Sequence, residues 1–265
     1  PYGHRPRRQA DELYHTAQAI QSELDWVQAL REVQLVRTPA ILPAGSGEQI
    51  ILAQDSTGEE RHAVMFEFMP GVEPTEDRLV DDFKTLGAIT ARLHDQSKQW
   101  NRPSNFFRFT WDFETALGPN GHWGSWRDGL AMGPSELEIL GRLSDTLGSR
   151  LERYGKSKDR FGLVHADMRL ANLLVADKDV TVIDFDDCGF GVEAQDIAVA
   201  LYYLDTPEQE VSLLDGYKSI RPLPTYSDNA MKALLLQRRL LLLNYLFETK
   251  NAEHKEMLPA YLKRS

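Results

Sequence analysis

The sequence predicts an α+β fold in which strands and helices occupy separate parts of the chain. Strand-like segments occur at residues 49–54 and 63–69 and again, three in succession, between residues 161 and 183. Most of the remaining chain places apolar residues three or four positions apart, which is the spacing of amphipathic helices. With 265 residues, 42% of them hydrophobic and 26% charged, the chain can form one large domain or two lobes.

Composition argues against several classes of function. The net charge of −10 argues against a nucleic-acid partner, because few cations are left to offset phosphate repulsion. No apolar run reaches the roughly 18 residues that a membrane helix needs, and no secretory signal is visible. The single cysteine, Cys188, excludes an internal disulfide and a cysteine-based zinc site. We therefore expect a cytoplasmic protein that binds neither nucleic acid nor membrane.

The first part of the chain predicts one helix and two strands. The helix covers residues 10–31, and the strands at 49–54 and 63–69 follow it, the second ended by Pro70-Gly71. A two-stranded sheet is marginally stable and leaves an open edge. If these residues stood alone, we would expect the protein to self-associate through that edge, or the strands to be mobile.

The rest of the chain predicts a mainly helical region. Ser135 is the expected N-cap of one helix, with Glu138 three residues later. Gly189-Phe190-Gly191 is interpreted as a flexible turn. The aromatic stretch at 101–133 is loop-like and either forms irregular core or walls a substrate pocket. Helices are expected at residues 79–100, 135–153, 197–204, 208–216, 228–249 and 254–262.

Polar side chains gather at one end of a predicted hairpin. An apolar strand at 161–164 leads into a polar loop that contains Asp167, and a hairpin over 173–183 follows. This hairpin is expected to bring Asn172 and Asp184 together at one end, beside Asp167. Carboxylate and carboxamide oxygens suit magnesium, and one carboxylate remains to act as a base.

Two motifs in a fixed order carry a resemblance to a known family: His165-x-Asp167-x4-Asn172 and Ile183-Asp184-Phe185. They resemble the catalytic core of the protein-kinase-like small-molecule kinases, the aminoglycoside phosphotransferase and choline kinase superfamily. The resemblance implies a two-lobed protein-kinase-like fold, with a small N-terminal β lobe over residues 1–70 and a large, mainly helical lobe over 71–265. It also implies ATP- and Mg²⁺-dependent transfer of a phosphate group to the hydroxyl of a small molecule such as an aminoglycoside, choline or homoserine.

The resemblance implies a role for each matching residue of the core. Asp167 would orient and deprotonate the substrate hydroxyl, while Asn172 and Asp184 would hold magnesium on the ATP phosphates. His165 is expected to brace the loop by hydrogen bonds. Asp196 would brace the same loop from below, or would act as a plain helix cap.

Three more residues match the nucleotide-binding part of the family. Glu23 matches the helix glutamate that pairs with a phosphate-binding lysine; the alternative is a solvated surface glutamate. The carbonyl of Glu67 and the amide of Met69 match the hinge that meets the adenine edge; the alternative is an ordinary strand end. The Gly-rich turn and lysine-bearing strand that the family places before this helix have no counterpart. The small lobe is therefore interpreted as incomplete, and we expect the cationic partner of Glu23 upstream of Pro1.

Two other interpretations stay open. One is a Ser/Thr protein kinase of the stress-response type, which the lack of an activation segment with an Ala-Pro-Glu stop disfavours. The other is a nucleotide-binding scaffold with impaired catalysis. The missing phosphate-binding turn favours the scaffold, whereas the intact Asp167, Asn172 and Asp184 oppose it.

Overall fold

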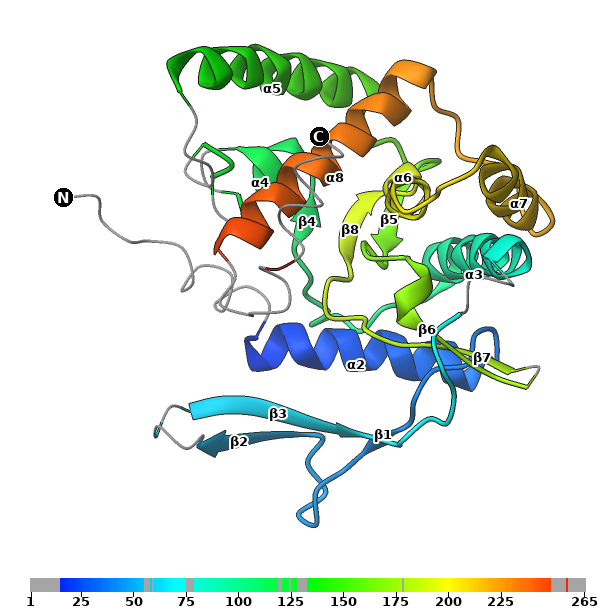
Figure 1. Ribbon diagram of the computed structural model, residues 1–265. Coiled ribbons are helices and arrows are strands. Elements are labelled where there is room, and N and C mark those ends of the chain that lie inside the picture. The colour runs from blue at the N-terminus through cyan, green and yellow to red at the C-terminus, as the bar shows by residue number, and fades with distance from the viewer. Residues whose placement is uncertain are drawn as a thin grey trace.

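The computed structural model describes residues 15–248 and residue 256, with gaps at 55–57, 59, 75–78, 119–120, 124, 128–132 and 178. Within this part of the chain the strands form three small sheets, and helices make up most of the remainder, which confirms the predicted α+β class (Figure 1). In chain order the elements are α2 (Ala17–Glu32), β1 (Ile41–Leu42), β2 (Ile50–Gln54), β3 (Glu60–Phe66), α3 (Leu79–Gln99), β4 (Thr110–Trp111), α4 (Phe113–Leu117), α5 (Pro134–Tyr154), β5 (Phe161–Val164), the short 3₁₀ helix η2 (Leu170–Asn172), β6 (Leu173–Ala176), β7 (Asp179–Val182), β8 (Gly189–Val192), α6 (Ala194–Tyr202), α7 (Pro207–Lys218) and α8 (Asp228–Glu248).

The small sheet has three strands, so the expectation of a two-stranded lobe is wrong. β1 and β2 both pair antiparallel with β3, in the order β1-β3-β2. β3 lies three residues nearer the N-terminus than predicted, because its bounds follow from pairing with β2, where Gln54 lies opposite Glu60. Its side chains are exposed or only partly buried, so an apolar pattern does not define it.

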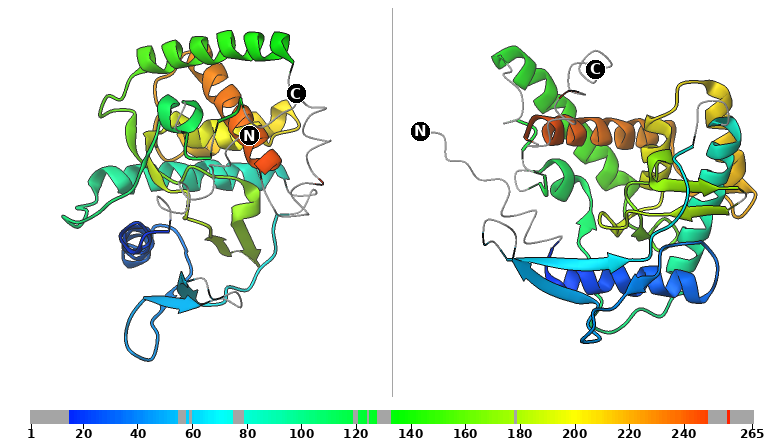
Figure 2. Two further views of the ribbon diagram at one scale, coloured as in Figure 1. Left: turned by 90° about the vertical axis from the view of Figure 1, so that its left-hand side faces the viewer. Right: turned by 60° about the horizontal axis from the view of Figure 1, so that its bottom comes forward.

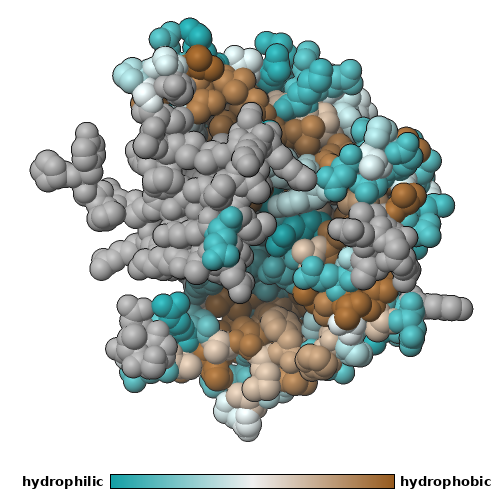
Figure 3. Space-filling view, in the orientation of Figure 1, coloured by the Kyte–Doolittle hydropathy of each residue, from teal (hydrophilic) through white to brown (hydrophobic). Residues whose placement is uncertain are grey.

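Large apolar side chains are exposed on the small sheet. They lie on β2, on β3 and in the segment that follows: Ile51, Leu52, Met65, Phe66 and Phe68. Figure 3 shows apolar residues gathered over this part of the molecule. Self-association through the sheet stays a prediction, since a single chain does not test it.

Helix α2 packs on the large lobe as well as on the small sheet. It begins where the Thr16 hydroxyl oxygen accepts a hydrogen bond from the Ala19 amide at 3.1 Å. The earlier residues that were predicted helical, before His15, lie outside the described part of the chain. Trp26 and Leu30 are buried in one cluster with residues of α3, β5 and the hairpin. Figures 1 and 2 show α2 lying between the small sheet and the remaining elements. The predicted lobe boundary at residue 70 stays a prediction.

The hairpin of β6 and β7 is hydrogen-bonded to both connections of the small sheet. The Val182 amide donates to the Arg37 carbonyl at 2.8 Å, in the connection between α2 and β1. Val72 and Val175 exchange hydrogen bonds of 3.1 and 2.8 Å in the connection between β3 and α3. The hairpin that carries the polar cluster therefore also fixes the position of the small sheet.

Residues 189–192 form strand β8, so the interpretation of Gly189-Phe190-Gly191 as a flexible turn is wrong. β8 lies between β4 and β5 in a three-stranded sheet, parallel to the first and antiparallel to the second. A Cβ at Gly189 would lie 2.8 Å from the Phe109 carbonyl oxygen, and one at Gly191 would lie 3.0 Å from a methyl of Val164. Glycine is present at positions 189 and 191 because other segments of the same chain approach closely, and not because the chain turns there.

Two further corrections concern the helical region. α5 begins at Pro134 with Gly133 as its N-cap, so the assignment of Ser135 as the cap is wrong; proline suits the first helical position because the amide it lacks would have no intrahelical partner there. In the aromatic stretch, Phe109, Trp111 and Trp126 are buried in a core cluster. Trp111 and Phe113 also line a cavity of about 510 Å³, so the stretch forms irregular core and also the wall of a pocket. Of the helix predicted at 254–262, only residue 256 belongs to the described residues, and it is helical. Among those residues, no helix combines the length and apolar character needed to cross a bilayer.

The crossing of α3 and α7 generates a test of stability. A Cβ at Gly87 would lie 2.0 Å from the Leu213 carbonyl oxygen, and one at Gly216 would lie 2.0 Å from the Lys84 carbonyl oxygen. We expect Gly87→Ala to lower the free energy of unfolding by about 1–3 kcal/mol, because the helices must separate. Gly141→Ala on α5 is the control: its Cβ would meet nothing within 4 Å, and a gain of about 0.5–1 kcal/mol is expected. Urea unfolding measures both variants, and equal stabilities would contradict the close crossing.

Candidate active site

One buried carboxylate holds the loop that follows β5. Asp196, in the first turn of α6, accepts hydrogen bonds from the amides of His165 at 3.0 Å and Ala166 at 2.7 Å. His94 Nε2 is hydrogen-bonded to the same carboxylate at 3.1 Å, and its Nδ1 to the Tyr217 hydroxyl at 2.8 Å. A buried carboxylate is costly unless donors surround it. Asp196 therefore braces the loop, as the resemblance implied, and is not a plain helix cap.

The loop and the hairpin both contain strained backbone. Ala166 has a φ of 70° and Asp184 a φ of 67°, in the left-handed region that residues other than glycine rarely adopt. His165 lies between them, with Nε2 3.3 Å from the Ile183 carbonyl oxygen and Nδ1 accepting from the Asp167 amide at 3.4 Å. These contacts confirm that His165 braces the loop. Strain of this kind is held in place by such contacts and is concentrated at functional sites.

Asp167 is buried and surrounded by donors. Asn172 Nδ2 donates to its Oδ2 at 3.0 Å and to its carbonyl at 2.8 Å, and Arg169 Nε donates to the same Oδ2 at 3.0 Å. Arg238, on α8, donates to Oδ1 and also to the Tyr203 hydroxyl oxygen at 3.1 Å. Burial alone would raise the pKa of Asp167, but the two arginines outweigh it and hold the pKa below its usual value. The carboxylate is thus ionised and fixed in orientation.

The hairpin register brings Asn172 and Asp184 together, as predicted. Leu173 lies opposite Val182, and the Ile183 amide donates to the Asn172 carbonyl at 3.0 Å. The Asn172 side chain donates through its nitrogen to Asp167, and its amide oxygen is the group suited to a cation.

Electrostatics at Asp184 fit a divalent cation. The pKa of Asp184 is raised to about 6, first by partial desolvation of the carboxyl and then by its neighbour Asp186. A cation would relieve that repulsion. Among the described residues, no group of three or more His, Cys, Asp or Glu side chains has the arrangement of a complete metal site. One carboxylate and one carboxamide match the way proteins hold magnesium, with phosphate oxygens and water as the other ligands.

Glu23 faces this site from α2. Its side chain is only 14% exposed, so the alternative of a solvated surface glutamate is wrong. Burial raises its pKa to about 7; Arg108 lowers it, and the negative charges of Asp186 and Asp184 raise it further. The nearest charge partner in the described chain is Arg108 Nη1, 3.9 Å from Glu23 Oε2.

The predicted adenine hinge lies outside this cluster. Glu67 and Met69 lie in an irregular segment that follows β3. The alternative, that they form the end of a strand, is therefore corrected, because the strand ends three residues earlier, at Phe66. The Glu67 amide donates to the Ala40 carbonyl at 2.7 Å. That bond uses the amide and not the carbonyl that was matched to adenine. The assignment of both residues stays a prediction.

Arg108 is a central residue that sequence reasoning missed. Its side chain is fully buried and donates to three backbone carbonyls: Cys188 at 2.5 Å, Ala19 at 3.1 Å, and Asp186. One guanidinium thus connects α2 to the loop after Asp184. A signal was available, because an arginine among Phe106, Phe107 and Phe109 is a charge in apolar surroundings, and such charges are buried only with partners.

Arg238 was missed in a similar way. It interrupts the apolar run of α8 within Gln237-Arg238-Arg239, and no sequence pattern indicates its partner. Its contact with Asp167 joins residues 71 positions apart. The signal was the charge itself, since a buried arginine on an apolar helix needs an anion.

Comparison with known proteins agrees with this geometry. Amicoumacin kinase of Bacillus subtilis (strain 168) is 26% identical over 185 residues, which are 69% of this chain and 52% of that protein, so the match spans about half of that relative. The structure of a microcompartment-associated aminopropanol kinase is 40% identical, with a TM-score of 0.81, over 94% of this chain and 80% of the other. An amicoumacin kinase in complex with AMP-PNP, Ca²⁺ and Ami is 24% identical with a TM-score of 0.71, over 94% and 77% of the two chains, and is similar in fold.

These matches confirm the protein-kinase-like fold class. A family model described as the phosphotransferase enzyme family matches residues 6–226, which is most of the chain. On this match, and on the 40% identity to a solved kinase, the chain belongs to the phosphotransferase enzyme family.

Proposed function

We propose that the protein is an ATP- and Mg²⁺-dependent phosphotransferase that acts on a hydroxyl of a small molecule. The observation that carries this proposal is the single cluster of Asp167, Asn172 and Asp184, held by the braced loop and the hairpin register. In a phosphotransferase, protein groups mainly position the reactants and offset charge. The cluster provides an oriented base and a cation site for that chemistry.

Asp167 is the proposed base. As the acceptor hydroxyl bonds to the γ-phosphorus, its proton passes to a carboxylate oxygen of Asp167, and the bond to the bridging oxygen of ADP breaks. Asn172 and Arg238 keep the carboxylate in one orientation. Magnesium held by Asn172 and Asp184 would supply neutralisation of phosphate charge. Glu23 and Arg108 support the same side of the site, and Glu67 and Met69 are the proposed adenine contacts.

An amino alcohol is the proposed substrate class. The 40% identity to an aminopropanol kinase supports it, over 94% of the chain. So does the acidic group beside the base: the pKa of Asp187 is raised by burial and by its acidic neighbours Asp186 and Asp167. An ammonium group there would offset that repulsion. Aminoglycosides, choline and homoserine are the competing acceptors.

A panel assay tests the substrate class. ADP release is measured with aminopropanol, choline, homoserine and an aminoglycoside, each with ATP and Mg²⁺. The highest kcat/KM is expected for aminopropanol. Turnover of another alcohol would reassign the substrate, and ATP binding without turnover of any alcohol would favour the scaffold interpretation.

Asp167→Asn tests the base. We expect kcat to fall by about two to four orders of magnitude, because the amide cannot accept the hydroxyl proton. The affinity for AMP-PNP should change little, since the base acts on the acceptor. Asp145→Asn is the matched control, because it makes the same substitution at an exposed position of α5. Near-normal turnover in the Asp167 variant would remove it from the mechanism.

Asp184→Asn tests the cation site. Calorimetry of AMP-PNP binding at several Mg²⁺ concentrations should show a requirement for Mg²⁺ raised about tenfold or more, because a charged ligand becomes neutral. Asp179→Asn is the matched control, since it lies at the other end of the same hairpin and pairs with Arg37. An unchanged Mg²⁺ requirement would transfer the role to Asp186.

Arg108→Met tests the connection between α2 and the loop after Asp184. Three buried carbonyls lose their donor, so we expect the free energy of unfolding to fall by about 2–4 kcal/mol and the Mg²⁺ requirement to rise. Arg108→Lys keeps the positive charge but lacks the planar guanidinium. We expect its Mg²⁺ requirement to stay above that of the wild-type protein. Arg102→Met is the control. Arg102 lies in the same connection between α3 and β4, but it donates to the Ser97 carbonyl at 3.3 Å and not to the loop after Asp184. A Mg²⁺ requirement equal to that of the control would make Arg108 purely structural.

A further inference from the structure

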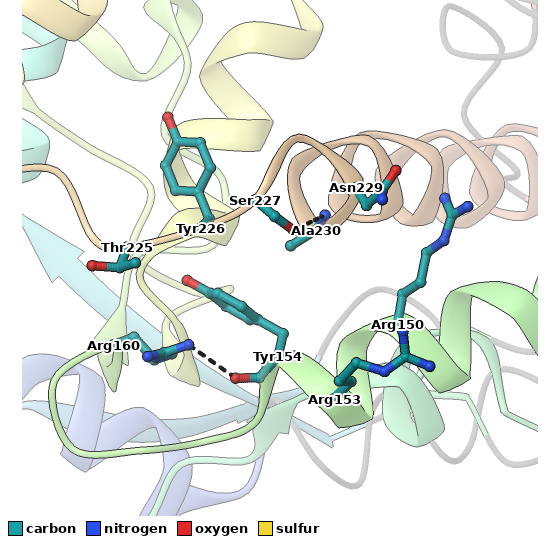
Figure 4. A pocket seen from close by; sticks show the side chains of 9 residues that line it. All are labelled: Arg150, Arg153, Tyr154, Arg160, Thr225, Tyr226, Ser227, Asn229 and Ala230. Carbon is teal, nitrogen blue, oxygen red and sulfur yellow. Dashed lines mark hydrogen bonds between the residues drawn. The ribbon is translucent and has the colours of Figure 1, made fainter.

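A second pocket lies at the far end of the large lobe, outside the catalytic cluster. It has a volume of about 410 Å³, within the range of small-molecule sites. Its walls come from the end of α5, the residue before β5, and the first turn of α8. Figure 4 shows Arg150 extending from α5 toward Asn229 on α8, with the Tyr154 ring between the two elements.

Three arginines line this pocket in a chain whose net charge is −10. Arg160 is fixed, because it donates to the Tyr154 carbonyl at 3.1 Å and pairs with Asp159 at 3.2 Å. Arg150 and Arg153 form no ion pair or hydrogen bond with any described residue. Unpaired arginines are common on protein surfaces. Here Arg150 and Arg153 line the same pocket as Arg160, so the pocket carries the positive charge of two arginines that no described acidic side chain pairs with. That charge favours an anion.

One neutral donor points to the same ligand class. The start of α8 is already capped, because the amides of Ala230 and Met231 donate to the Ser227 carbonyl at 2.9 and 3.1 Å. Asp228 also places a carboxylate in the first turn. The hydroxyl group of Tyr154 is buried and has no hydrogen-bond partner among the described residues. Ser227 precedes the helix, and its hydroxyl oxygen accepts from the Ala230 amide at 3.3 Å. The donors that point to phosphate are therefore the guanidinium groups and the Tyr154 hydroxyl, which are groups that proteins use to bind it.

We propose that this pocket binds a small molecule that carries a phosphate group. Guanidinium donors in a fixed fork match the oxygens of phosphate, and the pocket can hold a group larger than the free ion. The site differs from the catalytic one: Arg160 precedes β5, whereas His165 and Asp167 follow it. Nine residues of α8, roughly 13 Å at 1.5 Å each, separate Asn229 in the pocket from Arg238 at the base.

Calorimetry with inorganic phosphate, at low ionic strength and without nucleotide or divalent cation, tests the site. Wild type is compared with Arg150→Gln, Arg153→Gln and the double variant. We expect each single change to weaken phosphate binding about tenfold, because a charge-assisted hydrogen bond is lost. Arg142→Gln is the matched control: it removes one charge from the same helix, where Arg142 pairs with Glu138 at 2.8 Å outside the pocket. That variant should bind phosphate as wild type does.

Three outcomes would overturn the proposal. They are equal phosphate affinity in the double variant and wild type, equal weakening in the Arg142 control, and no binding of phosphate by the wild-type protein. Thermal unfolding confirms that each variant is folded. Since no substrate is present, the result does not depend on the proposed kinase activity.

Discussion

The carboxylate of Asp196 is the point on which the rest of the large lobe depends. It is fully buried, and it is hydrogen-bonded to the loop after β5 and to His94 on α3, whose ring is also hydrogen-bonded to Tyr217 on α7. Removing one of these partners leaves the buried charge less well compensated, which is costly. The loop that presents Asp167 is therefore fixed by the same contacts that join three helices. Active-site geometry and helix packing are one energetic unit here.

A second constraint joins α2 to the loop after Asp184. Phe185 is buried against Trp26, edge to face at 5.5 Å, and against His165 at 4.6 Å between ring centroids. Arg108 adds hydrogen bonds to both elements on the same side. Apolar packing supplies affinity between the elements, whereas the arginine bonds fix their register. The position of α2 relative to the loop after Asp184 is thus set by side chains that contact both elements.

The sequence could predict the site better than the scaffold around it, for a physical reason. Asp167, Asn172 and Asp184 lie within 18 residues on a loop and a hairpin, so local register alone brings them together. β8 could not be predicted, because its glycines serve contacts with Phe109 and Val164 that only the fold creates. Arg108 and Arg238 make their contacts across 70 to 90 residues, and a single sequence carries no pattern for such pairs.

The arginines divide into two groups that share structural elements. Arg108, Arg169 and Arg238 are held by carboxylates and carbonyls of the candidate site, where they offset an acidic cluster. Arg150 and Arg153 stand in the second pocket with no described partner, although the protein has an excess of acids. Strand β5 and helix α8 run between the two groups. Both begin at the pocket; β5 ends three residues before Asp167, and α8 carries Arg238, which contacts Asp167. Asn229 in the first turn of α8 and Arg238 beside Asp167 lie nine residues apart on this helix, roughly 13 Å along its axis. One continuous helix therefore carries both Arg238, which contacts Asp167, and the first turn that lines the pocket with Arg150 and Arg153.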